Sequence, residues 1–277
     1  MQRRQFLATV GVGIATSAAG CASNGGSSTS APFEHPGTLE TRMVANGEFP
    51  ADENPADGYS PAVSDPPDAP DFDPSTFDTV SANGESIRLV PIDIAIAWHK
   101  RGEARFVDSR GLGQYERSHV YGSVLSTAQR NSDGGPIPDW GRDGRVVTYC
   151  GCPHHLSSLR AAGLQKAGFS DVYAIDEGFG AWHDRDYPMA GKTFASSTDS
   201  SISEWTIEGA VDSQYAGEYA WASADSQYEA APIGSDGRFA LHLKFANVDS
   251  ETQIQVSTPA FTVTRPLGEL VAEVVDG

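Results

Sequence analysis

The chain has 277 residues, 39% of them hydrophobic, which is long enough for an ordinary α/β domain and a smaller second domain. Its 37 acidic residues against 19 basic ones give a formal net charge of −18, which excludes nucleic acid as a favourable partner. An acidic excess spread along the whole chain, with arginine preferred over lysine, is typical of a halophilic protein kept hydrated in concentrated salt.

The first 21 residues have the features of an export signal that ends at a lipid-attachment site. Arg3 and Arg4 precede an apolar run of small residues that is too short to span a bilayer, as in a twin-arginine signal peptide. The run ends in Ala18-Ala19-Gly20-Cys21, which resembles a lipobox. We therefore expect residues 1–21 to be a signal peptide with a lipobox. The mature protein would be exported and held at the outer face of the cytoplasmic membrane by a lipid anchor on Cys21.

Residues 22–85 have the composition of a linker. Their first part is rich in glycine and serine, and residues 49–78 are dense in proline and aspartate. Proline at this density excludes a helix or a central strand. The segment is therefore expected to be either an extended linker or a strap that lies on the domain that follows.

From residue 86 to residue 190, short apolar strands alternate with helices. The segments that favour strands are residues 87–90, 105–108, 123–125, 145–149 and 172–175. The segments that favour helices are residues 91–98, 114–117, the stretch from the loop after Cys150 to Gly168, and a closing helix from Phe179. Strands that alternate with helices through short links predict a parallel sheet flanked by helices, with ligands beyond the carboxyl ends of the strands.

Cys150 follows a buried-looking strand and precedes a helix. At such a place loop amides and the positive end of the helix can surround an anion and favour the thiolate. A lone cysteine after a strand is more often a small core residue. Here the following residues, Gly-Cys-Pro-His-His, are poor core material. The pattern therefore predicts that Cys150 is a nucleophile and that an anion cradle surrounds it, formed by Gly151, Cys152, His154, His155 and Leu156.

Several spaced motifs, in this order, resemble the rhodanese domain over about residues 87–188. They are Phe106-Val107-Asp108-Ser109-Arg110, His119-Val120-Tyr121-Gly122-Ser123, Val147-Thr148-Tyr149-Cys150, Ala167-Gly168-Phe169, Val172-Tyr173 and Glu177-Gly178-Phe179-Gly180-Ala181-Trp182. The resemblance implies a rhodanese-like fold and a sulfurtransferase. Its loop cysteine takes sulfane sulfur from a small donor, holds it as a persulfide and passes it to a thiol or a cyanide-like acceptor, without a cofactor. It also implies that Cys150 is this cysteine and that Asp108, Arg110 and His119 support the site.

The loop departs from the family pattern in its charge. Rhodanese loops usually carry an arginine or another donor-rich residue that grips thiosulfate, whereas residues 151–156 contain no permanent positive charge. Thiosulfate specificity is therefore open. Relatives of the fold with a lengthened loop act on phosphate or arsenate. Their pattern has an arginine near the end of the loop, where this chain has Leu156, so a phosphatase is a minor alternative.

Other readings of the loop remain. Cys150, Cys152, His154 and His155 are four candidate ligands for zinc or copper. A tight loop with inward amides opposes a metal, and we expect none. Cys152 either resolves a persulfide on Cys150 or packs the loop. The two histidines either promote the thiolate or are solvated. Asp108 and Arg110 are expected to form a structural ion pair rather than to act in catalysis.

At the level of function, the alternative to an enzyme is a non-catalytic rhodanese-fold binding module for an anion or a protein partner on the cell surface.

The carboxyl-terminal region favours strands only. After a linker over residues 191–203, apolar residues alternate within residues 205–209, 218–221, 239–243 and 252–256, and a glycine-flanked turn at 234–237 predicts a hairpin. Residues 204–277 are therefore expected to form a small all-β sandwich. Its aromatic residues, Tyr215, Tyr219, Trp221 and Tyr228, are expected in the core rather than on a ligand.

Overall fold

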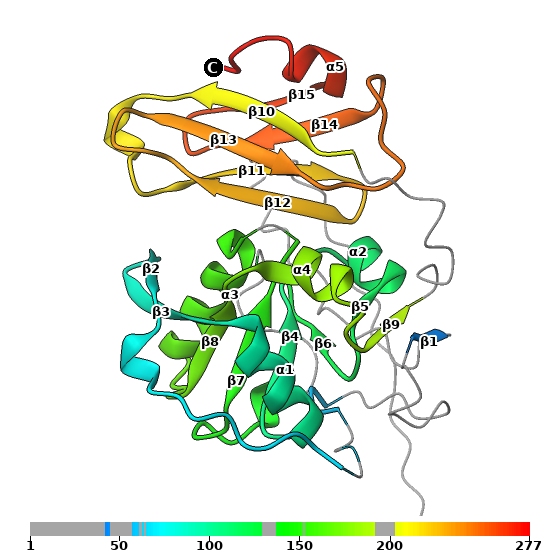
Figure 1. Ribbon diagram of the computed structural model, residues 1–277. Helices are drawn as coiled ribbons and strands as arrows, with labels where there is room; N and C mark the ends of the chain where they lie inside the picture. The colour runs from blue at the N-terminus through cyan, green and yellow to red at the C-terminus, as the bar shows by residue number, and fades with distance from the viewer. Residues whose placement is uncertain are drawn as a thin grey trace, which may run out of the picture. The chain divides into compact units, whose positions relative to one another are not determined.

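The computed structural model describes residues 42–44, 57–60, 63, 65–128, 137–151, 153–191 and 203–277 (Figure 1). The expected signal peptide with Cys21, much of the expected linker, and Cys152 lie outside these residues. In the described part of the chain, no helix combines the length and the apolar character needed to cross a bilayer.

The α/β domain is built on a six-stranded sheet with the order β2-β3-β8-β7-β4-β6. Its strands are β2 (Thr79–Ala82), β3 (Glu85–Val90), β4 (Arg105–Asp108), β6 (Val124–Leu125), β7 (Val146–Tyr149) and β8 (Val172–Ile175). All neighbouring pairs are parallel except β2 with β3. Every residue of β7 and β8 is buried, as expected for parallel strands covered on both faces. The parallel sheet expected from the sequence is confirmed.

Four helices accompany this sheet and flank it in Figure 1. They are α1 (Ile92–Arg101), α2 (Leu112–Arg117), α3 (His155–Lys166) and α4 (Gly178–Asp184). The first of them starts immediately after Pro91 and ends at Gly102, which adopts a left-handed conformation (φ 63°). Trp98, Phe106, Tyr173 and Trp182 are buried in the core between helices and sheet. A small antiparallel sheet of β1 (Arg42–Val44), β9 (Met189–Gly191) and β5 (His119–Val120) was not expected from the sequence.

Residues 71–78 of the proline-rich segment lie against the α/β domain. A short 3₁₀ turn, η1 (Pro74–Thr76), lies between two aromatic anchors. The Phe72 ring packs on Trp98 with centroids 5.1 Å apart, and the Phe77 ring packs on Tyr173 with centroids 6.0 Å apart. These contacts hold the strap against α1 and β8.

The sheet itself begins at Thr79, inside the region assigned to the linker (residues 22–85). Strands β2 and β3 form a hairpin through Asn83 and Gly84, which both have positive φ (49° and 81°). Asn-Gly is the pair that a two-residue hairpin turn favours, because its twist requires φ above zero at both positions. The Asn-Gly pair therefore indicates this hairpin in the sequence. The dense prolines before it led us to assign the short edge strand to the linker instead.

The carboxyl-terminal region forms two antiparallel sheets around one core, which confirms the expected small β-sandwich. One sheet pairs β10 (Trp205–Ala210) with β13 (Arg238–Leu243). The other has the order β12 (Gln227–Pro232), β11 (Tyr219–Ala224), β14 (Gln253–Ser257), β15 (Thr262–Pro266). Both sheets contribute to the core, which also takes in α5 (Leu267–Leu270). The turn at residues 234–237 is present, but it joins strands of different sheets, so the hairpin expected there is wrong.

Candidate active site

Cys150 stands at the carboxyl end of β7, which lies between β4 and β8 in the sheet. Its backbone carbonyl accepts a hydrogen bond of 2.8 Å from the Phe179 amide in α4, which fixes the start of the loop. The side chain is fully buried, with 0% of the residue exposed. The strand therefore presents the thiol at the edge of the sheet where parallel α/β folds place their ligands.

The hydroxyl oxygen of Ser157 lies 3.4 Å from the Cys150 sulfur. Ser157 belongs to the first turn of α3, and its carbonyl accepts a hydrogen bond of 2.9 Å from Thr148 Oγ1 in β7. The leading amides of a helix have no carbonyl partner within it and carry the positive end of its dipole. The sulfur is thus held beside a hydroxyl group and a helix amino terminus. Sequence reasoning missed Ser157; the only signal was a hydroxyl residue in the first turn after the cysteine loop.

Asp108 and Arg110 form a buried ion pair at the carboxyl end of β4. Arg110 Nε and Nη2 donate to the two carboxylate oxygens at 2.9 and 2.6 Å, and Nη2 also donates to the Ser118 carbonyl at 2.7 Å. Burial acts to lower the pKa of Arg110, but the charge and hydrogen bonds of Asp108 outweigh it and the pKa is raised. The guanidinium lies over the Phe179 ring, 4.0 Å from its centroid. Its charge is committed to Asp108, in agreement with a structural role.

His119 is buried beside the strand that carries the cysteine. Its Nδ1 lies 2.7 Å from the Tyr115 carbonyl, and the two rings stack with centroids 3.8 Å apart. The next residue, Val120, donates its amide to the Tyr149 hydroxyl at 3.1 Å, and Ser123 Oγ lies 2.8 Å from the same hydroxyl. His119 thus belongs to a packed segment that holds the ring of the residue immediately before Cys150.

The two loop histidines are held by different neighbours. His154 adopts a left-handed conformation (φ 45°), and its Nδ1 lies 3.6 Å from a carboxylate oxygen of Asp176, the residue after β8. His155 lies against the sandwich: burial lowers its pKa, the charges of His154 and His242 lower it further, and a hydrogen bond with the Ala230 backbone opposes the shift. One histidine is therefore tied to the end of the sheet and the other to the second domain.

Leu156 and Cys150 form one apolar cluster with residues of the sandwich. The buried members are Cys150, Leu156, Leu159 and Ala230, and Ala128, Tyr219 and Trp221 pack against them. The contacts place both domains in one unit of the chain. Strand β11 alternates strictly: its alanines are buried in the sandwich core, whereas Tyr219 and Trp221 are half-buried on the other face. The core location expected for these two aromatic residues is therefore wrong, because small alanines fill the space between the two sheets.

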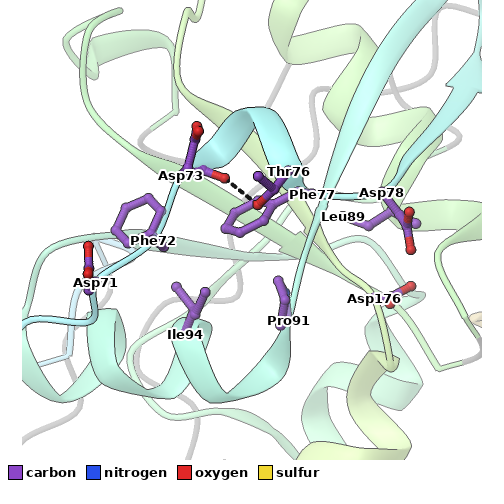
Figure 2. A pocket seen from close by; sticks show the side chains of 10 residues that line it. All are labelled: Asp71, Phe72, Asp73, Thr76, Phe77, Asp78, Leu89, Pro91, Ile94 and Asp176. Atoms are coloured by element: carbon purple, nitrogen blue, oxygen red, sulfur yellow. Dashed lines mark hydrogen bonds between the residues drawn. The ribbon is translucent and has the colours of Figure 1, made fainter.

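The described residues line two hollows, and one of them includes a residue of the loop. One, of about 460 Å³, lies between His155 and the sandwich, where Glu208, Arg238 and His242 also line it. The other, of about 390 Å³, is shown in Figure 2 between the strap and α1; it combines apolar side chains with four aspartates, including Asp176. Within the described residues, no three histidine, cysteine, aspartate or glutamate side chains gather as metal ligands would. Cys152, the fourth candidate ligand of the loop, lies outside them.

Comparison with known proteins identifies the central part of the chain. Residues 93–185 match the family model of the rhodanese-like domain. Among solved structures, a rhodanese-like domain from an Anabaena protein has 17% identity and a TM-score of 0.36, and covers 42% of this chain and 86% of its own. A Rhodopseudomonas palustris protein described as a possible tyrosine phosphatase has 30% identity, a TM-score of 0.33, and coverage of 37% and 83%. A thiosulfate sulfurtransferase from Pseudomonas aeruginosa has 19% identity, a TM-score of 0.34, and coverage of 39% and 20%.

Proposed function

We infer a sulfur-transfer function from the premise that residues 93–185 form a rhodanese-like domain. Cys150 is the nucleophile of this proposal. The observation that carries it is the position of the Cys150 sulfur, which lies after a central strand and 3.4 Å from the hydroxyl of Ser157 in the first turn of α3. A hydroxyl donor and a helix amino terminus both stabilise negative charge on sulfur.

The reaction is a double displacement. The Cys150 thiolate attacks the outer sulfur of a donor such as thiosulfate; the sulfur–sulfur bond of the donor breaks and sulfite leaves with the bonding electrons. Cys150 then carries a persulfide anion. A thiolate or cyanide attacks the terminal sulfur, the sulfur–sulfur bond to Cys150 breaks, and the thiolate of the enzyme is regenerated. Ser157 donates its hydrogen bond to the sulfur that carries the charge in the free enzyme, and no cofactor takes part.

The donor is expected to be small. Arg110 lies beside the loop in space, because a Cβ atom on Gly151 would be 3.8 Å from its Cδ, and its guanidinium is neutralised by Asp108 at 2.6 Å. A dianionic donor would therefore depend on backbone amides and on Ser157 rather than on a free cation, since an unpaired buried charge is costly. This favours weak discrimination between thiosulfate and other sulfane-sulfur donors.

The test measures thiocyanate formed from thiosulfate and cyanide in concentrated salt, with the full chain and the variants Cys150→Ser and Cys152→Ser. Loss of turnover in Cys150→Ser alone is the expected result, and it would reduce Cys152 to a packing residue. Loss in both variants would show that Cys152 is also required for sulfur transfer. The proposal fails if the unmodified protein, with Cys150 shown to be reduced, transfers no sulfur from thiosulfate or from an organic persulfide.

A binding module for an anion or a protein partner is the second candidate, because the thiol is completely buried under the sandwich. The two candidates differ in what Cys150→Ser does. A module retains its partner when the thiol becomes a hydroxyl of similar shape, whereas an enzyme loses all turnover.

Export and lipid anchoring complete the proposal. Residues 1–21 would direct the chain across the membrane, and Cys21 would carry the lipid. Cys21→Ala is then expected to move the protein from the membrane fraction to the soluble fraction. An unchanged distribution would remove the anchor from the proposal without affecting the sulfur chemistry.

A further inference from the structure

The sandwich residues that cover Cys150 belong to one hairpin. Strands β11 and β12 pair along their whole length, from Tyr219 opposite Pro232 to Ala224 opposite Gln227, and Asp225 and Ser226 form the turn. Tyr219 and Trp221 lie on the first strand and Ala230 on the second, and all three pack on the Cys150 cluster. A single structural unit of the second domain therefore closes the thiol from solvent.

The tip of this hairpin sits in a seat made by two glycines at the start of α2. A Cβ atom on Gly111 would lie 1.8 Å from the Ser226 carbonyl oxygen, and one on Gly113 would lie 2.6 Å from Ser226 Oγ. At Gly111 the obstacle is the Ser226 backbone, so the close approach requires glycine there; at Gly113 it is only the Ser226 hydroxyl, which can rotate away. Gly111 precedes α2 as its N-cap, and its lack of a side chain is explained by the hairpin tip that lies against it.

Between the described residues, two long polar bonds join the tip to this seat. The Gly113 amide donates to the Ser226 carbonyl at 3.3 Å, and the Tyr228 amide donates to Gln114 Oε1 at 3.3 Å. Both bonds are at the long end of the normal range. By contrast, the hairpin is anchored within the sandwich by Gln227, whose amide group makes bonds of 2.7 and 3.0 Å with the backbone of Ala246. The weaker side of the hairpin faces α2.

We propose that the β11–β12 hairpin is a cover over Cys150 that must leave the Gly111–Gly113 seat before a donor reaches the sulfur, with Tyr219 and Trp221 as specificity-determining residues. A fully buried thiol reacts only in the fraction of molecules in which its cover is open. While the cover is open, the two aromatic rings border the entrance, so their size limits the donors that pass. The proposal deepens the proposed function, because it concerns access to the same sulfur.

The geometry supplies a direct test by locking the cover. A Cβ atom on Gly113 would lie 3.9 Å from the Ser226 Cβ, which is close to the usual separation of about 3.8 Å in a disulfide. The full chain carrying Gly113→Cys and Ser226→Cys, in a Cys152→Ser background, is oxidised, and the cross-link is verified by non-reducing peptide mapping. The rate of Cys150 alkylation by iodoacetamide is then followed by mass spectrometry of its peptide. Peptide mapping counts the label on Cys21 and on the introduced cysteines separately.

The locked protein is expected to alkylate Cys150 at least about tenfold more slowly than the same protein after reduction, as for a state open in a minority of molecules. The Ser226→Cys single variant is the matched control, since it cannot form the cross-link and should give one rate under both conditions. Equal rates in the locked and reduced double variant would overturn the proposal.

A second measurement decides the matter if the double variant does not fold or does not cross-link. Trp221→Ala should speed the reaction of Cys150 with a bulky maleimide more than its reaction with iodoacetamide. Trp205→Ala, which removes a tryptophan of the same domain outside the Cys150 cluster, should change neither rate. Unchanged rates in Trp221→Ala would refute the cover. These readouts follow the thiol and not sulfur transfer, so failure of the cover and failure of the proposed function remain distinct.

Discussion

Ser157 Oγ and Cys150 Sγ lie 3.4 Å apart, both buried, at the junction of β7 and α3. Ser157→Ala is expected to lower the rate of thiocyanate formation about ten- to a hundredfold, because a hydrogen bond to a charged group contributes about 1.5–3 kcal/mol. The matched control is Ser158→Ala. Ser158 is also buried, and its hydroxyl has no hydrogen-bond partner among the described residues. That variant should keep the rate. Equal losses in both variants would mean that Ser157 acts only through packing.

Removing the charge of Asp108 is expected to destabilise the protein strongly. Asp108→Asn leaves the Arg110 guanidinium buried without its counterion, which should cost about 3–5 kcal/mol of unfolding free energy. The measurement is chemical denaturation in concentrated salt. Asp93→Asn provides the comparison, because the Asp93–Arg185 pair is exposed and its loss should cost less than about 1 kcal/mol. A similar small cost for both would contradict a structural role for the buried pair.

His99 is expected to make the free energy of unfolding decrease as the pH is lowered from 6.5 toward about 4. Burial lowers its pKa from 6.5 to about 4, although its hydrogen bond with the Tyr121 carbonyl acts in the opposite direction. The unfolded chain therefore takes up a proton that the folded chain excludes, and the stabilisation is complete above pH 6.5 and lost as the pH falls toward about 4. The loss amounts to about 3 kcal/mol.

The check for this histidine is the difference between two denaturation series across that window. His99→Gln is expected to remove most of the pH dependence, whereas His183→Gln, at an exposed position on α4, should leave it intact. His155, whose pKa is lowered by burial, acts in the same direction, so a residual slope is expected. Identical slopes in the parent and in His99→Gln would refute the assignment.

Gly111→Ala is expected to disturb the hairpin seat. Its Cβ would overlap the Ser226 carbonyl group, so either the hairpin lifts or the backbone moves, at a cost of about 1–3 kcal/mol. The prediction is lower stability together with faster alkylation of Cys150. Gly180→Ala in α4 is the control, since the nearest atom to its Cβ would be 3.9 Å away and alanine favours a helix. Slower or unchanged alkylation in Gly111→Ala would contradict the seat.

Much of the α/β domain could be predicted because its signals are local. Strands β4 and β8 have the bounds that their apolar runs indicated, and α1 begins at Ile92, one residue after the expected start at Pro91. The placement of Cys150 between a strand and a helix was predicted in the same way and is observed, whereas its role as a nucleophile stays a prediction. Asp108 and Arg110 are two residues apart, and their pairing was also expected.

The packing of the second domain on Cys150 could not be predicted, since it depends on contacts between distant parts of the chain. Strand β11 reads Tyr-Ala-Trp-Ala-Ser-Ala, and its period of two does not say which face is the core. The larger apolar surface of the aromatic residues favoured placing them in the core. The space between the two sheets is instead filled by the smaller alanines. Nothing in the local sequence marks Gly111 as a contact site, because the Ser226 carbonyl that lies against it is more than a hundred residues further along the chain.

The six-stranded sheet ends in short strands on both sides: β6 has two residues and β2 has four. Exposed strand edges are the places where one chain adds to another, and long edges promote aggregation. In concentrated salt the repulsion between acidic molecules is screened over a few ångströms, so a charge of −18 protects them less than it would in dilute buffer. Short edges give a neighbouring molecule few backbone groups to pair with, and this protection does not weaken as the salt concentration rises.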